Sequence, residues 1–246
     1  IQPTAANDDT MINGKSVLQW QKLLRHYDFE RNADESQQER MHKQEDEYVR
    51  ANFFIRYRPA TLSECTIHSS VQDEIPHMNN HIIVLGKGLS NLFDLIRPLR
   101  SKSLDMIRCI VIVHPTDIPH SVWTRISLFE GIFFVRGSAL EDNDLRRAGI
   151  FRANRVVILA DTQGSSKSSK YLNSDADSIF SLQAVRRLNE RANSVVEIVK
   201  HSNIGYLDPD AAASGEEYYR FTPHFGAGNL FTTSMLDTVA CQVSYA

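Results

Sequence analysis

The 246-residue sequence contains little cysteine, no large charge imbalance and no long hydrophobic run. Its three cysteines, Cys65, Cys109 and Cys241, form no CxxC pair, which excludes a disulfide framework or zinc knuckle and favours a reduced, intracellular setting. The formal net charge of −3 gives no basic excess for binding nucleic acid. The longest apolar runs, at 109–113 and 156–160, are far shorter than the roughly 20 residues of a membrane-spanning helix.

The sequence motifs of common enzymes are also missing. There is no GxSxG, HExxH or P-loop motif, and no hydroxyl or thiol has a convincing base beside it. The nine histidines are scattered and do not indicate a zinc site. We therefore predict that the protein is not an enzyme.

The chain is expected to have three parts. Residues 1–74 are predicted to be an inter-domain linker or extension, partly helical, with a helix over 16–27 and a charged, amide-rich stretch at 32–47. The aromatic stretch 52–57 is a candidate to dock on the part that follows. Residues 75–205 are predicted to form the folded core. Residues 206–246 are predicted to hold an acidic loop, a glycine hinge and an apolar interface helix.

Short apolar runs alternate with helical patterns after residue 81. Strands are expected at 82–85, 109–113, 132–135, 156–160 and 195–199. Helices are expected at 92–99, 122–129, 143–148 and 175–189. Uniformly apolar strands that alternate with helices indicate a parallel sheet covered on both faces. The predicted fold is α/β, a Rossmann-like doubly wound parallel sheet.

A glycine turn follows the first of these strands, where a dinucleotide fingerprint belongs. Gly86 and Gly88 are candidate cofactor-binding residues, together with Asp161 at the end of the fourth strand. Asn91 replaces the third glycine, and the second strand ends in His114 instead of a ribose-binding carboxylate. A tight turn without a cofactor is therefore the favoured interpretation, and NAD binding is disfavoured.

Acidic residues cluster in two further places. Asp175 and Asp177 open the 175–189 helix, where capping and a favourable helix dipole are preferred over cation binding. The loop after the fifth strand carries four candidate Ca²⁺ ligands, which are Asp208, Asp210, Glu216 and Glu217. Three alanines in the middle of this loop offer no side-chain oxygen, which favours a solvated surface turn.

The glycine hinge near 226 is expected to lead into a helix with one apolar face. Such a face packs either within its own domain or against a partner domain or subunit, and the sequence leaves both open. The candidate assembly residues are Phe225, Leu230, Phe231, Met235, Leu236 and Val239.

Several motifs occur together in the order found in one known family. RGSA at 136–139, DLRRAGI at 144–150, ANRVVILAD at 153–161 and DADSIF at 175–180 resemble the RCK (KTN-type) regulatory domain of potassium channels. LIRPLR at 95–100 and FGAG at 225–228, followed by SMLDT at 234–238, resemble the second RCK domain of Slo-family channels, either calcium-activated (BK-like) or sodium-activated. The resemblance covers about residues 75–246, and 1–74 looks like the linker between tandem RCK domains.

This resemblance implies a cytoplasmic module of a membrane channel, without catalysis. Two RCK domains per subunit would assemble across four subunits into a gating ring, with Ca²⁺ or Na⁺ as ligand. The implied partners are the first RCK domain of the same subunit and neighbouring subunits. No nucleic acid is implied, and the membrane is reached only through an attached pore domain.

Two alternative functions remain open, and in one loop the sequence differs from the family pattern. The alternatives are a nucleotide-binding RCK/KTN-type domain of a potassium transport system and, less favoured, an NAD-dependent oxidoreductase. The departure is the acidic loop: where BK-type channels have a run of calcium-binding aspartates, this chain has alanine at 211–213. We therefore predict that the loop binds Ca²⁺ weakly or not at all, because the affinity of an oxygen site depends on its charge.

Overall fold

A computed structural model describes residues 11–12, 15–16, 48–89, 91–160, 175–207 and 226–232. The chain divides into two units, residues 1–54 and 55–246. In the first unit, β1 (Met11–Ile12) pairs antiparallel with β2 (Lys15–Ser16), and residues 48–52 are helical. Ser16, predicted to begin a helix, lies in β2 instead, and residues 17–47 are outside the described residues. No helix in the described ranges is long and apolar enough to span a membrane.

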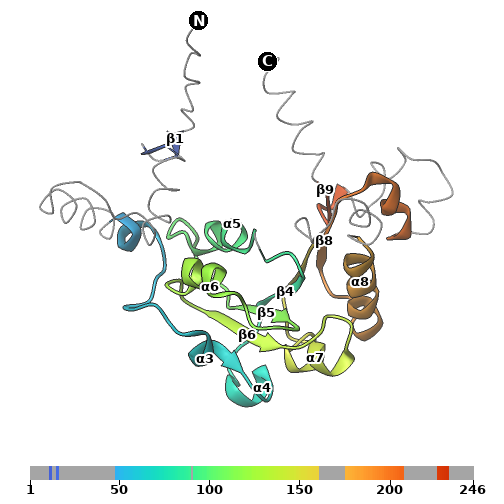
Figure 1. The fold of residues 1–246 in the computed structure, drawn as a ribbon, viewed down its shortest axis with the longest axis horizontal. Coiled ribbons are helices and arrows are strands. Elements are labelled where there is room, and N and C mark those ends of the chain that lie inside the picture. The colour runs from blue at the N-terminus through green and yellow to red at the C-terminus, as the bar shows by residue number, and fades with distance from the viewer. Residues whose placement is uncertain are drawn as a thin grey trace, which may run out of the picture. The chain divides into compact units, whose positions relative to one another are not determined.

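A seven-stranded parallel sheet forms the core of the second unit. Its strands stand in the order β3-β6-β5-β4-β7-β8-β9 (Figure 1). They are β3 (Thr66–Ile67), β4 (Ile82–Gly86), β5 (Ile110–His114), β6 (Ile132–Arg136), β7 (Arg155–Leu159), β8 (Ser194–Ile198) and β9 (Leu230–Thr232). All five residues of β5 are buried, as expected for a central parallel strand. The predicted Rossmann-like α/β fold is confirmed.

The helices cover both faces of this sheet. They are α3 (Leu62–Cys65), α4 (Val71–Glu74), α5 (Leu92–Ile96), η1 (Pro98–Arg100), α6 (His120–Ile126), α7 (Asp142–Arg147), α8 (Ala176–Leu188) and η2 (His201–Tyr206). The chain moves one way through β4, β5 and β6, then returns to β7 beside β4 and moves the other way. Right-handed crossovers therefore place α5 and α6 on one face and α7 and α8 on the other.

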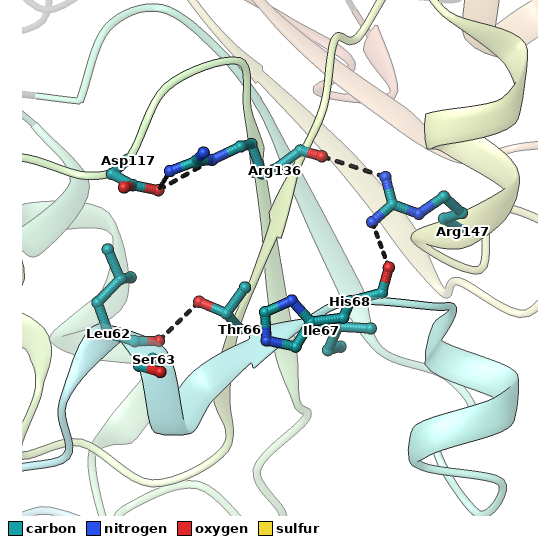
Figure 2. Close-up of a pocket in the computed structure, with 8 residues that line it drawn as sticks. All are labelled: Leu62, Ser63, Thr66, Ile67, His68, Asp117, Arg136 and Arg147. Carbon is teal, nitrogen blue, oxygen red and sulfur yellow. Dashed lines mark hydrogen bonds and ion pairs between the residues drawn. The ribbon is translucent and has the colours of Figure 1, made fainter.

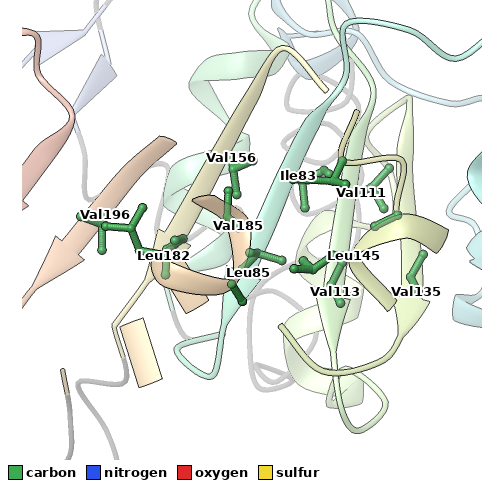
Figure 3. Packing of buried hydrophobic residues seen from close by; sticks show 14 of the residues in the cluster. Ile83, Leu85, Val111, Val113, Val135, Leu145, Val156, Leu182, Val185 and Val196 are labelled. Carbon is green, nitrogen blue, oxygen red and sulfur yellow. The ribbon is translucent and has the colours of Figure 1, made fainter. Parts of the chain in front are cut away.

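The larger core cluster lies under α7 and α8 (Figure 3). Leu145 of α7 and Val185 of α8 are fully buried against strand residues such as Ile83, which pairs with Val111 on one side and Val156 on the other. Side chains alternate along a strand, so Val84 points to the opposite face, toward α5 and α6. The sheet is thus a rigid layer that holds the loops at its carboxyl edge.

Two predicted boundaries differ in the structure. The predicted helix at 92–99 is divided into α5 and η1, because Pro98 lacks an N–H group and its ring clashes with the preceding helical turn. The predicted core at 75–205 is too short, because β3 and β9 add strands at the two edges of the sheet. Residues 55–74 therefore belong to this unit instead of to a linker, and Ile55 docks on it through an antiparallel bridge to Phe129.

Buried polar groups fix the loops between these elements. The Arg100 guanidinium is fully buried and donates to the carbonyl oxygens of Glu130 (2.6 Å), Leu99 (2.9 Å) and Gly131 (3.2 Å). Burial lowers the pKa of Arg100 to about 10. These hydrogen bonds to carbonyl oxygens join η1 to the turn before β6, so this arginine serves the fold.

Candidate functional site

The carboxyl edge of β4 and β7 is the point where the strand order reverses, which is where ligands of doubly wound folds bind. Gly86 ends β4 with φ of +115°, and a Cβ atom there would lie 2.1 Å from the carbonyl oxygen of Leu159 in β7. The glycine is thus required by the close approach of two strands. Gly88, the second glycine of the turn, is buried.

The groups around this turn are already paired with protein partners. Lys87 Nζ lies 2.7 Å from Asp177 Oδ2, which connects the turn to the first turn of α8. The next helix, α5, has only five residues, and Asn91 makes no side-chain cap to it. At the end of β5, where a ribose-binding carboxylate belongs, His114 Nδ1 lies 2.7 Å from the carbonyl oxygen of Thr116. The arrangement favours a structural turn over a dinucleotide cradle.

Asp175 forms the most buried acidic centre at this edge. Its carboxylate has no solvent exposure and accepts hydrogen bonds from the backbone N–H groups of Val199 (2.7 Å) and Lys200 (2.9 Å) and from the amide of Asn203 (2.7 Å). The predicted side-chain cap on α8 is wrong: φ of −92° and ψ of −17° are already helical, whereas a capping residue is extended. Asp175 instead clamps the start of α8 to the turn after β8.

Glu197 is a second carboxylate at this edge, and the sequence reasoning passed over it. It is half-buried in β8 and accepts a hydrogen bond from the backbone N–H of Ala160 (3.0 Å), just past β7. Burial raises the pKa of Glu197, and the nearby Asp175 charge raises it further, against the effect of the Ala160 hydrogen bond. A glutamate inside the otherwise apolar VVEIV run was the available signal. Within the described ranges no three histidine, cysteine or acidic residues are grouped to hold a metal ion.

Comparisons with known proteins identify the domain that carries this edge. A family model described as the calcium-activated potassium channel slowpoke-like RCK domain matches residues 77–196. Residues 77–196 are a Slo-like RCK domain. This finding confirms the predicted resemblance to an RCK domain of a Slo-family channel.

Potassium channels are among the relatives of this chain, and a solved structure shares its fold. Potassium channel subfamily T member 1 of Mus musculus and of Homo sapiens is 26% identical over 196 residues, covering 71% of this chain and 16% of each relative. The putative potassium channel protein YugO of Bacillus subtilis is 38% identical over 156 residues, covering 61% of this chain and 42% of that protein. The human SLO3 gating ring has the same fold, with a TM-score of 0.64 at 20% identity, over 79% of this chain and 35% of that one. The chain thus spans a minor part of the length of these proteins.

Most of the predicted ligand and interface residues of the RCK domain lie outside the described residues. They are Asp161, Asp208, Asp210, Glu216, Glu217, Phe225, Met235, Leu236 and Val239. Among the predicted interface residues, two are described: Leu230 and Phe231 lie in β9 and not on a helix, which corrects that prediction. Leu230 pairs with Val196 and is buried in the sheet's own core, whereas Phe231 is 36% exposed. Leu230 is therefore covered within its own domain.

Exposed aromatic side chains mark another surface of the RCK domain. Phe180 is 55% exposed on the outer side of α8, which it shares with Gln183 and Arg187. Phe151, which follows α7, is 51% exposed and lies under the Arg146 guanidinium, 5.2 Å from the ring centroid. Both rings are therefore available for burial against a partner.

Proposed function

We propose that the chain is a cytoplasmic gating-ring domain of a Slo-like potassium channel that couples ion binding to pore opening. The match of residues 77–196 to the Slo-like RCK family carries this proposal. Potassium channels among its relatives and the shared fold of the SLO3 gating ring support it. The domain acts without catalysis, as the second of two tandem RCK domains, and its partners are the first RCK domain and neighbouring subunits of a tetramer.

In this proposal, Asp175 couples the segment that precedes the acidic loop at 208–217 to helix α8. An ion biases the pore only through the difference between its affinities for the two shapes of the ring. The acidic loop at 208–217, with Asp208, Asp210, Glu216 and Glu217 as candidate ligands for Ca²⁺ or Na⁺, follows β8 and η2. Asp175 hydrogen-bonds the turn between them, so movement of that turn is passed to α8. Because the alanines at 211–213 offer no side-chain oxygen, we still predict that this loop binds Ca²⁺ weakly or not at all.

The exposed side of α8 is the surface that we assign to the neighbouring RCK domain. Phe180 is the large apolar side chain on that side, and burying a phenylalanine contributes roughly 1.5–3 kcal/mol. Burial of Phe180 against a neighbouring domain would therefore stabilise the ring, whereas in a monomer the ring of Phe180 stays in contact with water.

Current recordings from the full-length gene product that contains this chain test the proposal. In inside-out membrane patches, steps of Ca²⁺ or Na⁺ on the cytoplasmic face should change the open probability of a potassium-selective current and leave its single-channel conductance unchanged. Phe180→Asp should weaken this ion dependence, and Gln72→Asp, which adds a charge on the exposed side of α4, should leave it intact. A current that is not selective for potassium, or that ignores both cytoplasmic ions, would contradict the proposed function.

A further inference from the structure

A cavity of about 590 Å³ lies away from the strand-reversal point, at the carboxyl ends of β3 and β6. Its walls include Leu62 and Ser63 of α3, and His68 just after β3. The opposite wall is formed by Asp117, Arg136 and Arg147. Figure 2 shows the two guanidinium groups above the cavity and the side chains of Leu62, Ser63 and His68 below them. Its volume is in the range of small-molecule sites.

Arg136 is the cation that an incoming ligand meets most readily. Its side chain is 58% exposed, and Nε (3.0 Å) and Nη2 both contact a single oxygen, Oδ1, of Asp117. Nη1 has no acceptor among the described residues. The Asp117 side chain is itself 57% exposed, and exposed ion pairs are weak because water and salt screen them. An anion can therefore replace Asp117 as the partner of Arg136 with little loss of folding stability.

Arg147 supplies a fixed positive charge on the same wall. Its Nε donates to the Ser69 carbonyl (2.8 Å), and its Nη1 donates to the Arg136 carbonyl (3.1 Å) and to Asp144 Oδ1 (2.9 Å). Nη2 donates to the His68 carbonyl (2.9 Å). A guanidinium has five N–H donors, so one N–H on Nη2 remains for a ligand. Because four bonds hold the group, its position is set before any ligand arrives.

Two further polar side chains lie across the cavity from these arginines. The His68 ring and the Ser63 hydroxyl are exposed, and neither has a hydrogen-bond partner among the described residues. Glu74 lies on the backbone side of this turn, where it accepts the N–H groups of His68 (2.7 Å) and Ser69 (2.6 Å). The turn is thereby held without using the imidazole.

We propose that this cavity binds a small phosphate monoester, whose phosphate takes Arg136 from Asp117 and whose organic part lies against Leu62. Two guanidinium groups, on Arg136 and Arg147, line the cavity together with the polar side chains of His68 and Ser63. Guanidinium groups bind phosphate through charge-assisted, often bidentate hydrogen bonds, which favours a phosphate as the ligand. The cavity is larger than a bare phosphate fills, and Leu62 gives it an apolar wall. Asp117 acts as an internal competitor that keeps the arginine paired when the cavity is empty.

Calorimetric titration of the full 246-residue chain at constant ionic strength tests the proposal, with inorganic phosphate and phenyl phosphate as probes. Phenyl phosphate should bind saturably at one site and more tightly than inorganic phosphate. Arg136→Gln should weaken binding by about tenfold or more, because a charge-assisted hydrogen bond is lost. Asp117→Asn should tighten it by about two- to fivefold, because the competitor is removed.

The exposed ion pair between Arg187 and Asp142, which joins α8 to α7, provides matched controls. Arg187→Gln and Asp142→Asn make the same charge changes elsewhere and should leave the affinity unchanged, with folding checked by circular dichroism. The site is overturned if no saturable binding occurs or if the control variants alter binding as much as the cavity variants. Equal affinity for the two probes would contradict a phosphate monoester as the ligand and would indicate inorganic phosphate instead.

Discussion

At the residue scale, position 86 leaves no space for a side chain, because β7 runs against the turn after β4. We predict that Gly86→Ala lowers the free energy of unfolding by roughly 3 kcal/mol, through a clash with the Leu159 carbonyl and an unfavourable positive φ. Gly226→Ala is the control, since no atom lies within 4 Å of a Cβ atom there. Urea unfolding measures both. A near-neutral Gly86→Ala variant would show that the glycine is kept for a ligand instead.

His81 gives the fold a dependence on pH. It is fully buried at the start of β4, where Nε2 lies 2.9 Å from the Ala148 carbonyl and Nδ1 has no hydrogen-bond partner in the described part of the chain. Burial lowers the pKa of His81 below its ordinary 6.5, more than the Ala148 hydrogen bond raises it. The unfolded chain therefore takes up a proton below pH 6.5 that the folded chain does not, so stability falls as pH drops from 6.5 toward the folded pKa.

We predict that His81→Gln, which keeps a donor for Ala148, flattens the loss of thermal stability between about pH 7 and pH 5. Comparing the melting temperatures of the two chains across this range isolates the contribution of His81. His77→Gln, on an exposed side chain nearby, should leave the slope as it is. An unchanged slope in His81→Gln would show that another group controls the acid sensitivity.

At the scale of elements, Asp175 is the link between α8 and the turn after β8. Asp175→Asn replaces one acceptor oxygen with a donor amide facing the N–H groups of this turn, and we expect about 2–3 kcal/mol of destabilisation. Asp177→Asn removes only the exposed ion pair with Lys87 and should change stability by less than about 1 kcal/mol. Chemical denaturation of both variants checks this difference. Equal effects would mean that Asp175 is not a clamp.

The long strands were predictable within about one residue of their observed ends, because parallel strands buried on both faces are continuous apolar runs. Leu230 and Phe231 were assigned to a helix, since a three-residue edge strand has too few residues to show a period of two. The position of the glycine turn was also predictable. The partners of Asp175 were not, because Val199, Lys200 and Asn203 reach it only through the packing of β8 beside α8.

At the scale of the whole molecule, a seven-stranded sheet carries helix α8, whose outer side is exposed. The turn that would hold a coenzyme is closed by Leu159 and by the Lys87–Asp177 pair. Phe180 on α8 is the exposed apolar side chain that we assign to the interface with a neighbouring domain. In the proposed function the RCK domain works through contact with its neighbours, so the central requirement of that proposal is that this contact forms.

Sedimentation velocity of the full 246-residue chain over a wide concentration range tests that requirement most directly. We predict reversible, concentration-dependent self-association that Phe180→Asp weakens at least about tenfold, because an apolar side chain at the interface is replaced by a charge. Gln72→Asp, on the exposed side of α4, should leave the association nearly unchanged. A chain that remains monomeric at every concentration, or that associates equally well with Phe180→Asp, would contradict the account.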